Sequence, residues 1–239
     1  MAEMKSFGEV LRIALLGYGK MGRLLDRMAT EAGHEVILKI GSDNAHDLTV
    51  AHLQGADVAI DFSHPSTGFE HVEICLRAGV PVVSGTTGWL DRFGEAKQLC
   101  GELNGALFYA SNFSVGVNVF FALNRFLAQQ MNSLPDYRVT LSETHHTAKV
   151  DAPSGTALTI AEGILAELDR LETLPTIESH RIDPTPGTHE VVYRSAEDRI
   201  RIEHVAHSRE GFARGALRAA GWIVGRKGVF GMSDLLRSA

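Results

Sequence analysis

Apolar residues in the first half of the chain occur in short runs, separated by stretches in which they recur at helical spacing. The runs cover residues 11–16, 36–40, 58–62, 80–84 and 106–110. Runs of this length that end at glycine or another turn residue predict buried strands, and the stretches between them predict helices. Strands that alternate with helices form βαβ units, so the pattern predicts an α/β protein with a parallel sheet and right-handed crossovers.

The pattern changes after Asn112. Residues 115–131 have the periodicity of one long helix, residues 137–142 that of a strand, and residues 155–168 that of a second helix. Three β-like stretches, IESHRI, EVVYR and RIRIEHVA, then follow, and the turn DPTPGT separates the first two. Helical spacing returns at 212–224 and from Ser233. The second half therefore predicts an α+β domain inserted before the last helical segment.

Composition and charge exclude several classes of protein. The 239 residues are 44% hydrophobic and carry a formal net charge of -6, so we expect no broad basic surface for nucleic acid or anionic membranes. Apolar runs are far shorter than a membrane-spanning helix needs, and the first residues contain no run typical of a signal peptide. Cys75 and Cys100 show no disulfide or zinc spacing, which is typical of free thiols in a reducing compartment. We therefore expect a cytoplasmic protein.

A glycine-rich turn lies between the first predicted strand and helix. Its sequence, Gly17-Tyr18-Gly19-Lys20-Met21-Gly22, has the spacing GxGxxG. In this position the glycines allow a tight turn, a close approach of a pyrophosphate, and close packing of the helix on the sheet. The N-terminus of the helix also offers free N–H groups to phosphates. The turn predicts a dinucleotide site, and an ordinary tight turn is the alternative.

The choice of nucleotide stays open. An acidic residue at the end of the second strand binds the ribose 2′-hydroxyl of NAD in this kind of fold. Here Gly41 and Ser42 occupy that position and Asp43 comes slightly later, whereas Lys39 and Ser42 are compatible with a 2′-phosphate. The sequence is therefore compatible with NADPH or NADH.

Two further turns follow predicted strands of the same sheet. Gly85, Thr86 and Thr87 come after the fourth strand, and Ala110, Ser111, Asn112 and Phe113 come after the fifth. Ligands of parallel sheets bind beyond the carboxyl ends of the strands, so these small and hydroxyl-bearing residues are candidates to contact a nicotinamide ring. The alternative is two ordinary turns between a strand and a helix.

The stretch ETHHTAKVDAPSGTA, residues 143–157, gathers the polar residues of the second domain. Adjacent His145 and His146 cannot share one face of a strand or helix, and zinc spacing is absent, which argues against a metal site. A third ligand to Glu143 and His145 would have to come from elsewhere, such as His180, His189, His204 or His207. The sequence around Ser154 is not a nucleophile elbow. A solvated loop with a helix cap is a further alternative.

A site for an anion accounts for more of these residues. Ser154, Gly155 and Thr156 begin a predicted helix, whose free N–H groups and dipole favour a carboxylate. His145, His146 and Lys149 would add donors nearby. Lys149 is also a candidate proton donor, because hydride addition to an unsaturated acceptor leaves a carbon that needs a proton.

These motifs together resemble one family. The pattern E-x-H-H-x-x-K-x-D-x-P-S-G-T-A is similar to the signature of the dihydrodipicolinate reductases, also called 4-hydroxy-tetrahydrodipicolinate reductases, of lysine and diaminopimelate biosynthesis. The similarity spans nearly the whole chain, through GYGKMGR, AIDFSHP, VSGTTGW, YASNFSVGVN and GALRAAGWIVGRKGVFGMSDLL. The resemblance implies a Rossmann-type cofactor domain, residues 1–114 and 221–239. It also implies an inserted α+β domain, residues 115–220, that binds substrate and forms a homotetramer.

The resemblance also implies roles for individual residues. His145 corresponds to the general acid/base and Lys149 to the proton donor, while His146, Gly155 and Thr156 correspond to residues that hold the dicarboxylate substrate. The glycine-rich turn, the GTT turn and the ASNF turn would hold NADPH or NADH. The implied reaction adds hydride to the dehydrated ring of 4-hydroxy-tetrahydrodipicolinate and gives tetrahydrodipicolinate.

The chain departs from the family pattern at two places. Gly41 stands where many members have an acidic residue, and the connection around residues 174–175 is short. Three alternatives to this function remain. They are an NAD(P)-dependent oxidoreductase acting on another small dicarboxylate, an NAD(P)-binding protein without activity, and a histidine-based metallohydrolase.

Overall fold

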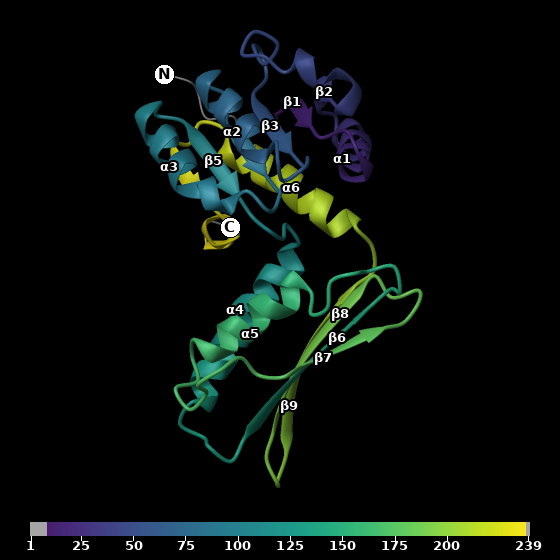
Figure 1. The fold of residues 1–239 in the computed structure, drawn as a ribbon, viewed down its shortest axis with the longest axis vertical. Helices are drawn as coiled ribbons and strands as arrows, with labels where there is room; N and C mark the ends of the chain where they lie inside the picture. The colour runs from purple at the N-terminus through teal and green to yellow at the C-terminus, as the bar shows by residue number, and fades with distance from the viewer. Residues whose placement is uncertain (1–8, 238–239) are drawn as a thin grey trace. The chain divides into compact units, whose positions relative to one another are not determined.

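The computed structural model describes residues 9–237, which form two compact units. One unit contains the described residues up to Val115 together with those from Phe212 onward, and the other is Gly116–Gly211. The chain therefore leaves the first unit once and returns to it. Each unit has its own sheet (Figure 1).

The first unit contains a six-stranded sheet in the order β10-β5-β4-β3-β1-β2, in which every pair of neighbours is parallel. The strands are β1 (Arg12–Leu16), β2 (Glu35–Ile40), β3 (Val58–Asp61), β4 (Val82–Ser84), β5 (Ala106–Tyr109) and β10 (Gly228–Phe230). The helices are α1 (Lys20–Glu31), α2 (Gly68–Arg77), α3 (Phe93–Glu102), α6 (Glu210–Ile223) and α7 (Met232–Arg237), with short 3-10 turns η1 (Ser42–Asp47) and η2 (Leu90–Arg92). The predicted parallel sheet is confirmed.

Both faces of this sheet are buried. Along β1, Ile13 and Leu15 belong to a core shared with α1 and α6, whereas Ala14 and Leu16 belong to a core shared with α2 and α3. Successive side chains of a strand point to opposite faces, so a strand covered on both sides needs apolar residues at every position. This explains why the strands occur in the sequence as continuous apolar runs.

Two features near the C-terminal end differ from the sequence-based boundaries. The expected return to the first unit at residue 221 comes earlier, at Phe212, because Ala213, Ala216 and Ala220 of α6 pack in the core of that unit. Strand β10 was not predicted, since three residues are too short to show a periodicity, yet it pairs with β5 and extends the sheet.

The second unit contains a four-stranded sheet in the order β7-β6-β8-β9. Its elements are α4 (Val115–Met131), β6 (Arg138–His145), α5 (Gly155–Leu165), β7 (Ile177–Arg181), β8 (Gly187–Arg194) and β9 (Arg199–Ala206). Strand β7 is parallel to β6, whereas β8 is antiparallel to both β6 and β9. The core lies between the sheet and the two helices and includes Phe120, Ile160, Ile164 and Tyr193. The predicted helix at 155–168 ends sooner, at Leu165.

Cys75 and Cys100 are free and buried. Cys75 lies on α2 in a wholly apolar core, and this burial raises the pKa of its thiol well above the usual value. Within residues 9–237, no helix combines the length and the apolar character needed to cross a membrane.

Candidate functional site

The glycine-rich turn joins β1 to α1 in the first unit. Gly17 has a φ of +93°, and an ideal Cβ at this position would lie 2.1 Å from the carbonyl oxygen of Phe62, so only glycine fits. Gly19 is the N-cap of α1 and supplies no side-chain cap for the first N–H groups of the helix. An ideal Cβ at Gly19 would meet no described atom within 4 Å. The turn therefore leaves both donors and space for an anion.

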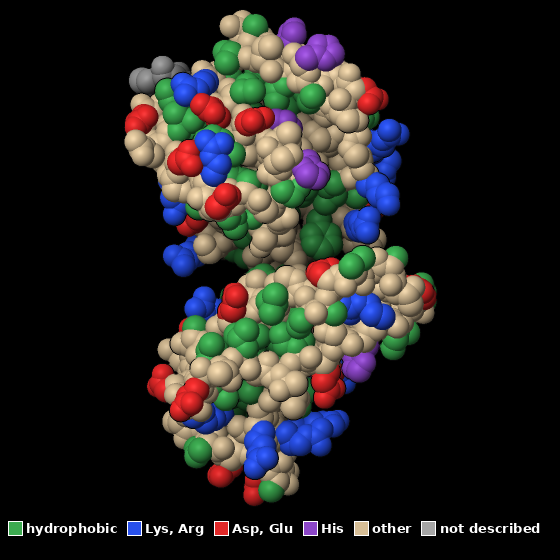
Figure 2. Space-filling view, viewed as in Figure 1, with side chains coloured by type: hydrophobic (Ala, Val, Ile, Leu, Met, Phe, Trp, Pro, Cys, Tyr) green, Lys and Arg blue, Asp and Glu red, His purple; other side chains and the backbone are tan. Residues whose placement is uncertain are grey.

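A pocket of about 610 Å³ opens at this turn. Gly17, Tyr18, Gly19 and Ser42, all candidates from the sequence, lie in its wall. Its other lining residues are Arg23, Lys39, Ile40, Gly41, Asp43, Asn44, Ala45, Phe62, Ser63, His64, Thr67 and His71. Figure 2 shows Lys and Arg side chains gathered over α1, which carries Lys20, Arg23 and Arg27. The positive charge that a nucleotide phosphate requires is therefore concentrated locally on a protein that is acidic overall.

Lys39 is held in a small polar network at the edge of this pocket. Its Nζ donates to Oδ2 of Asp26 at 2.7 Å, and the hydroxyl of Tyr18 donates to the same oxygen. The tip of β2 is also fixed, because the Asn44 side chain accepts from the N–H of Gly41 and donates to the carbonyl of Lys39. No pattern in the sequence indicates that Asp26 lies beside Tyr18 and Lys39 at this pocket.

The other candidates of the first unit lie next to the turn or at neighbouring strand ends. Lys20, Met21 and Gly22 form the first turn of α1, while the GTT and ASNF turns follow β4 and β5 and do not line the pocket. Phe113 is buried and packs against Phe62 and Phe108, with ring centroids 5.6 and 5.8 Å away. Its side chain therefore supports the fold of the turn.

A buried carboxylate forms hydrogen bonds with residues at the ends of two neighbouring strands. Asp61, at the end of β3, accepts hydrogen bonds from Ser63 at 2.6 Å, His71 at 3.0 Å and Ser84 at 2.9 Å. The backbone N–H of Ser63 in turn donates to the hydroxyl of Thr86 at 2.8 Å. The network ties the ends of β3 and β4 together, so that the GTT turn has one defined conformation.

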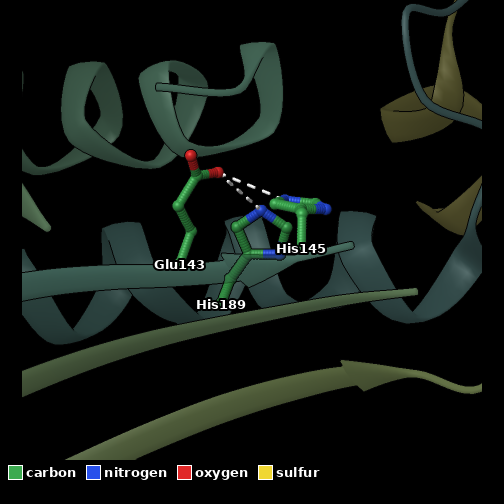
Figure 3. Close-up of side chains that lie close together, drawn as sticks. All are labelled: Glu143, His145 and His189. Atoms are coloured by element: carbon green, nitrogen blue, oxygen red, sulfur yellow. Dashed lines mark ion pairs between the residues drawn. The ribbon is translucent and has the colours of Figure 1, made fainter. Parts of the chain in front are cut away.

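In the second unit, strand register brings the polar residues of β6, β7 and β8 together. Glu143 of β6 pairs with Ser179 of β7 and with His189 of β8, and His145 pairs with Arg181. Glu143, His145 and His189 are all buried, and Figure 3 shows their side chains converging. Nε2 of His145 lies 3.2 Å from Oε2 of Glu143, and Nε2 of His189 lies 3.7 Å from it. Arg181 was not among the predicted site residues, and His189 was named only as one possible third ligand in the metal alternative.

The predicted anion site begins at the N-terminus of α5. Ser154 is its N-cap, and the hydroxyl of Ser154 accepts from the N–H of Ala157 at 3.1 Å. The N–H of Ser154 donates to Oε1 of Glu143 at 3.0 Å, so the buried carboxylate fixes the start of the helix. An ideal Cβ at Gly155 would meet no described atom within 4 Å, which leaves open space beside the first turn.

Lys149 lies in the loop between β6 and α5. Its Nζ donates to both carboxylate oxygens of Asp151, at 2.7 and 2.9 Å, and this ion pair lowers the pKa of Asp151. Arg181 donates to the carbonyl oxygens of Lys149 and Asp151 and so ties the loop to β7. Half-buried His146 begins the loop, and its carbonyl accepts from the N–H of Lys149.

The electrostatics of this cluster follow from burial. Burial acts to raise the pKa of Glu143, but hydrogen bonds from Ser154 and Ser179 outweigh it and hold this pKa below its usual value. Burial lowers the pKa of His145, although Glu143 opposes that effect. Burial lowers the pKa of His189 to about 4. At neutral pH the cluster therefore contains a carboxylate and two neutral imidazoles.

Stability should fall below neutral pH because of His189. A histidine in the unfolded chain takes up a proton near its ordinary pKa of 6.5, whereas folded His189 does so only near 4. The unfolded state therefore binds the extra proton between these values, and stability decreases as the pH falls through this window. We expect His189 to contribute a loss of about 2 kcal/mol between about pH 7.5 and about pH 5.

Urea unfolding at the two pH values measures this loss, and His189→Gln should remove most of it. His46→Gln, which changes a histidine with a side chain 80% exposed, is the control and should leave the pH dependence as it is. An equal pH dependence in wild type and His189→Gln would contradict the expectation.

Comparisons with known proteins cover nearly all of the chain. The family model described as dihydrodipicolinate reductase, N-terminus, matches residues 11–113, and the model described as dihydrodipicolinate reductase, C-terminus, matches residues 116–236. The first match corresponds closely to the part of the first unit that precedes α4. The second contains the whole second unit and the return to the first.

Two curated relatives carry the name 4-hydroxy-tetrahydrodipicolinate reductase. The protein of Christiangramia forsetii is 44% identical over 237 residues, which covers 95% of this chain and 98% of the relative. The protein of Neisseria gonorrhoeae is 34% identical over 265 residues, which covers 95% of this chain and 97% of the relative.

A solved structure shares the fold of the whole chain. It is the dipicolinate-bound dihydrodipicolinate reductase from Paenisporosarcina sp. TG-14, with a TM-score of 0.77 and 22% identity, and the match covers 93% of this chain and 98% of that one. A probable dehydrogenase from Thermotoga maritima matches at a TM-score of 0.55 and 14% identity, over 95% and 93% of the two chains. With both family models and both relatives in agreement, the chain belongs to the dihydrodipicolinate reductase family.

Proposed function

We propose that this enzyme reduces 4-hydroxy-tetrahydrodipicolinate to tetrahydrodipicolinate with NADPH or NADH, a step of lysine and diaminopimelate biosynthesis. Membership of the family supports this function most directly, through a relative 44% identical over 237 residues that is named 4-hydroxy-tetrahydrodipicolinate reductase. The polar cluster of the second unit also fits a dicarboxylate substrate. It offers a helix N-terminus, a lysine and two histidines on one loop and one strand end.

The first unit holds the nucleotide in this proposal. The bound nucleotide supplies the hydride. The N-terminus of α1 and the turn Gly17–Gly19 bind its pyrophosphate, and Ser42 with Lys39 lies where the adenosine ribose of a Rossmann-type site is placed. The GTT and ASNF turns, at the ends of β4 and β5, hold the nicotinamide. Neither Gly41 nor Ser42 carries an acidic group that would repel the 2′-phosphate of NADPH. NADPH and NADH are therefore both to be tested as hydride donors.

The second unit holds the dicarboxylate in this proposal. One carboxylate accepts hydrogen bonds from the first N–H groups of α5, at Gly155 and Thr156, and from the Thr156 hydroxyl. His146 contacts the same molecule. Lys149 supplies the proton after hydride addition, and Asp151 holds its ammonium within the loop until the substrate binds. His145 takes part in the proton transfers as acid or base.

Binding of dipicolinate, an aromatic dicarboxylate, tests the carboxylate site without turnover. Thr156→Val removes one hydroxyl at nearly constant volume, and we expect it to weaken binding about tenfold, the worth of a hydrogen bond to a charged group. Thr159→Val is the control, because its hydroxyl bonds the carbonyl of Gly155 within the same helix. Titration calorimetry measures both. Equal affinity of Thr156→Val and wild type would contradict this placement of the substrate.

We also propose that the enzyme forms a homotetramer in the cytoplasm. In the second unit, α4 and α5 cover one face of the sheet (Figure 1). The other face carries Arg201 of β9 with Glu190 and Glu203 as ion-pair partners. We expect this face to join four copies through their sheets. Light scattering should give four times the mass of the 26.0 kDa chain, and a monomer mass would contradict the assembly.

A further inference from the structure

Among the described residues of the second unit, six buried side-chain polar atoms lack an aligned hydrogen bond, and three of them belong to one cluster of side chains. These three are Oε2 of Glu143, Nε2 of His145 and Nδ1 of His189. Native proteins pair nearly all of their buried polar groups, so a cluster of exceptions in one place requires an explanation. The side chains come from neighbouring positions of β6 and β8 and point toward one another (Figure 3).

The two oxygens of Glu143 have different surroundings. Oε1 accepts from the N–H of Ser154 at 3.0 Å and from the Ser179 hydroxyl at 2.8 Å, and it lies 3.6 Å from the guanidinium of Arg181. Oε2 lies 3.2 Å from Nε2 of His145 and 3.7 Å from Nε2 of His189. The donors on Oε1 keep the carboxylate ionised. Its second oxygen, Oε2, can therefore accept a hydrogen bond from a protonated imidazole nitrogen.

A divalent metal ion is one way to satisfy these atoms. Each of the three residues offers a ligand atom, and these atoms lie within 4.8 Å of one another. However, the ammonium of Lys149 and the guanidinium of Arg181 lie close enough to affect the titration of His145. These two cations disfavour a dication at this place, and Asp151 offsets only the charge of Lys149. A proton satisfies the cluster without adding a double charge.

Both ring nitrogens of His145 face oxygen acceptors. Nε2 lies 3.2 Å from the Glu143 carboxylate and Nδ1 lies 3.4 Å from the carbonyl of Pro186. The contact of Nδ1 has hydrogen-bond geometry, and a carbonyl only accepts, so a neutral His145 carries its proton on Nδ1. Nε2 faces the carboxylate without an aligned hydrogen bond and is the nitrogen that gains and loses a proton; the charged, close carboxylate favours that proton. Gly187 allows this ring position, since an ideal Cβ there would lie 3.0 Å from Cε1 of His145.

His189 closes the other side of the ring. Its imidazole stands edge-on to that of His145, with centroids 5.1 Å apart and an interplanar angle of 72°. Burial keeps His189 neutral, and the presence of His145, His204 and Lys149 lowers the pKa of His189 further. A neutral neighbour of this size excludes water from the Glu143–His145 contact without competing for the carboxylate charge.

We propose that Glu143 and His189 are positioning residues for His145. Glu143 faces Nε2, the nitrogen that exchanges its proton, and stabilises the imidazolium form, while His189 holds the ring against the carboxylate. The proposal rests on the proposed function only for the use of that proton; the arrangement itself is a property of the protein without ligands.

Nitrogen NMR of the substrate-free, ¹⁵N-labelled enzyme tests the arrangement, with the His145 signals assigned by their absence from His145→Asn. In wild type we expect the neutral ring to be protonated at Nδ1, and a ring protonated at Nε2 would overturn the proposal. Glu143→Gln should move the His145 titration midpoint to lower pH by about one pH unit, because the carboxylate that favours the imidazolium is gone. Ser179→Ala, which removes a donor from Oε1, should leave the midpoint in place.

An unchanged midpoint in Glu143→Gln would also overturn the proposal. The wild-type tautomer decides the question even if that variant does not fold. Metal analysis of the purified wild type covers the alternative, because one equivalent of zinc that disappears in His189→Gln would assign the cluster to a metal. None of these measurements uses turnover, so they stand whether or not the enzyme reduces the proposed substrate.

Discussion

Lys149→Ala is expected to lower kcat about 100-fold, the usual contribution of a positioned proton donor. The nicotinamide nucleotide should bind as in wild type, because Lys149 belongs to the second unit and the pocket proposed for the nucleotide is lined by residues of the first. The ammonium lies in the loop that begins with His146, and it is paired with the exposed carboxylate of Asp151. A substrate carboxylate can therefore replace Asp151 without breaking any buried contact of the ammonium.

Steady-state kinetics of Lys149→Ala and of Lys97→Ala separate this role from a general effect of charge. Lys97 is exposed on α3 of the first unit, and its removal should leave kcat unchanged. Nucleotide affinity, measured by fluorescence, is the second readout. Turnover of Lys149→Ala at the wild-type rate would exclude this residue as the proton donor.

His145→Ala is expected to lower kcat by a similar factor of about 100. The physical reason differs from that for Lys149, because His145 is buried and held between Glu143 and the carbonyl of Pro186. Its removal takes away a group that can exchange protons near neutral pH and leaves Oε2 of Glu143 with one neighbouring imidazole, that of His189.

His180→Ala provides the matched control. His180 lies on β7 of the same sheet, and its side chain is 51% exposed, so its loss should change neither kcat nor folding. Circular dichroism and urea unfolding show whether His145→Ala remains folded. A folded His145→Ala variant with wild-type turnover would rule out acid–base catalysis by this histidine.

The architecture could be predicted largely from the sequence, because hydrophobic burial dictates it directly. Strands buried on both faces are apolar along most of their length, and this makes β1, after Arg12, and β3, before Asp61, visible as runs. The same reasoning fails for β10, which has three residues and depends on its pairing with β5. It also misplaces α6, because the periodicity of a helix does not say which core receives its apolar face.

The candidate site could be predicted only in part, for a related reason. Ser154 and the GxGxxG turn are recognisable from local backbone requirements, namely a cap and a close approach. The meeting of Glu143 with His189 depends instead on the register of β6 against β8, two strands far apart in the sequence. Arg181 joins them through the pairing of β6 with β7. The register between strands that lie far apart in the sequence leaves no pattern in the residues of either strand alone.

Consumption of NADPH and of NADH in the presence of freshly synthesised 4-hydroxy-tetrahydrodipicolinate tests the central claim most directly. The assay follows the absorbance of the reduced nicotinamide and compares it with reactions that lack either substrate or enzyme. We predict substrate-dependent oxidation of at least one nucleotide, with tetrahydrodipicolinate as the product. Oxidation of neither nucleotide by the folded enzyme would contradict the proposed function.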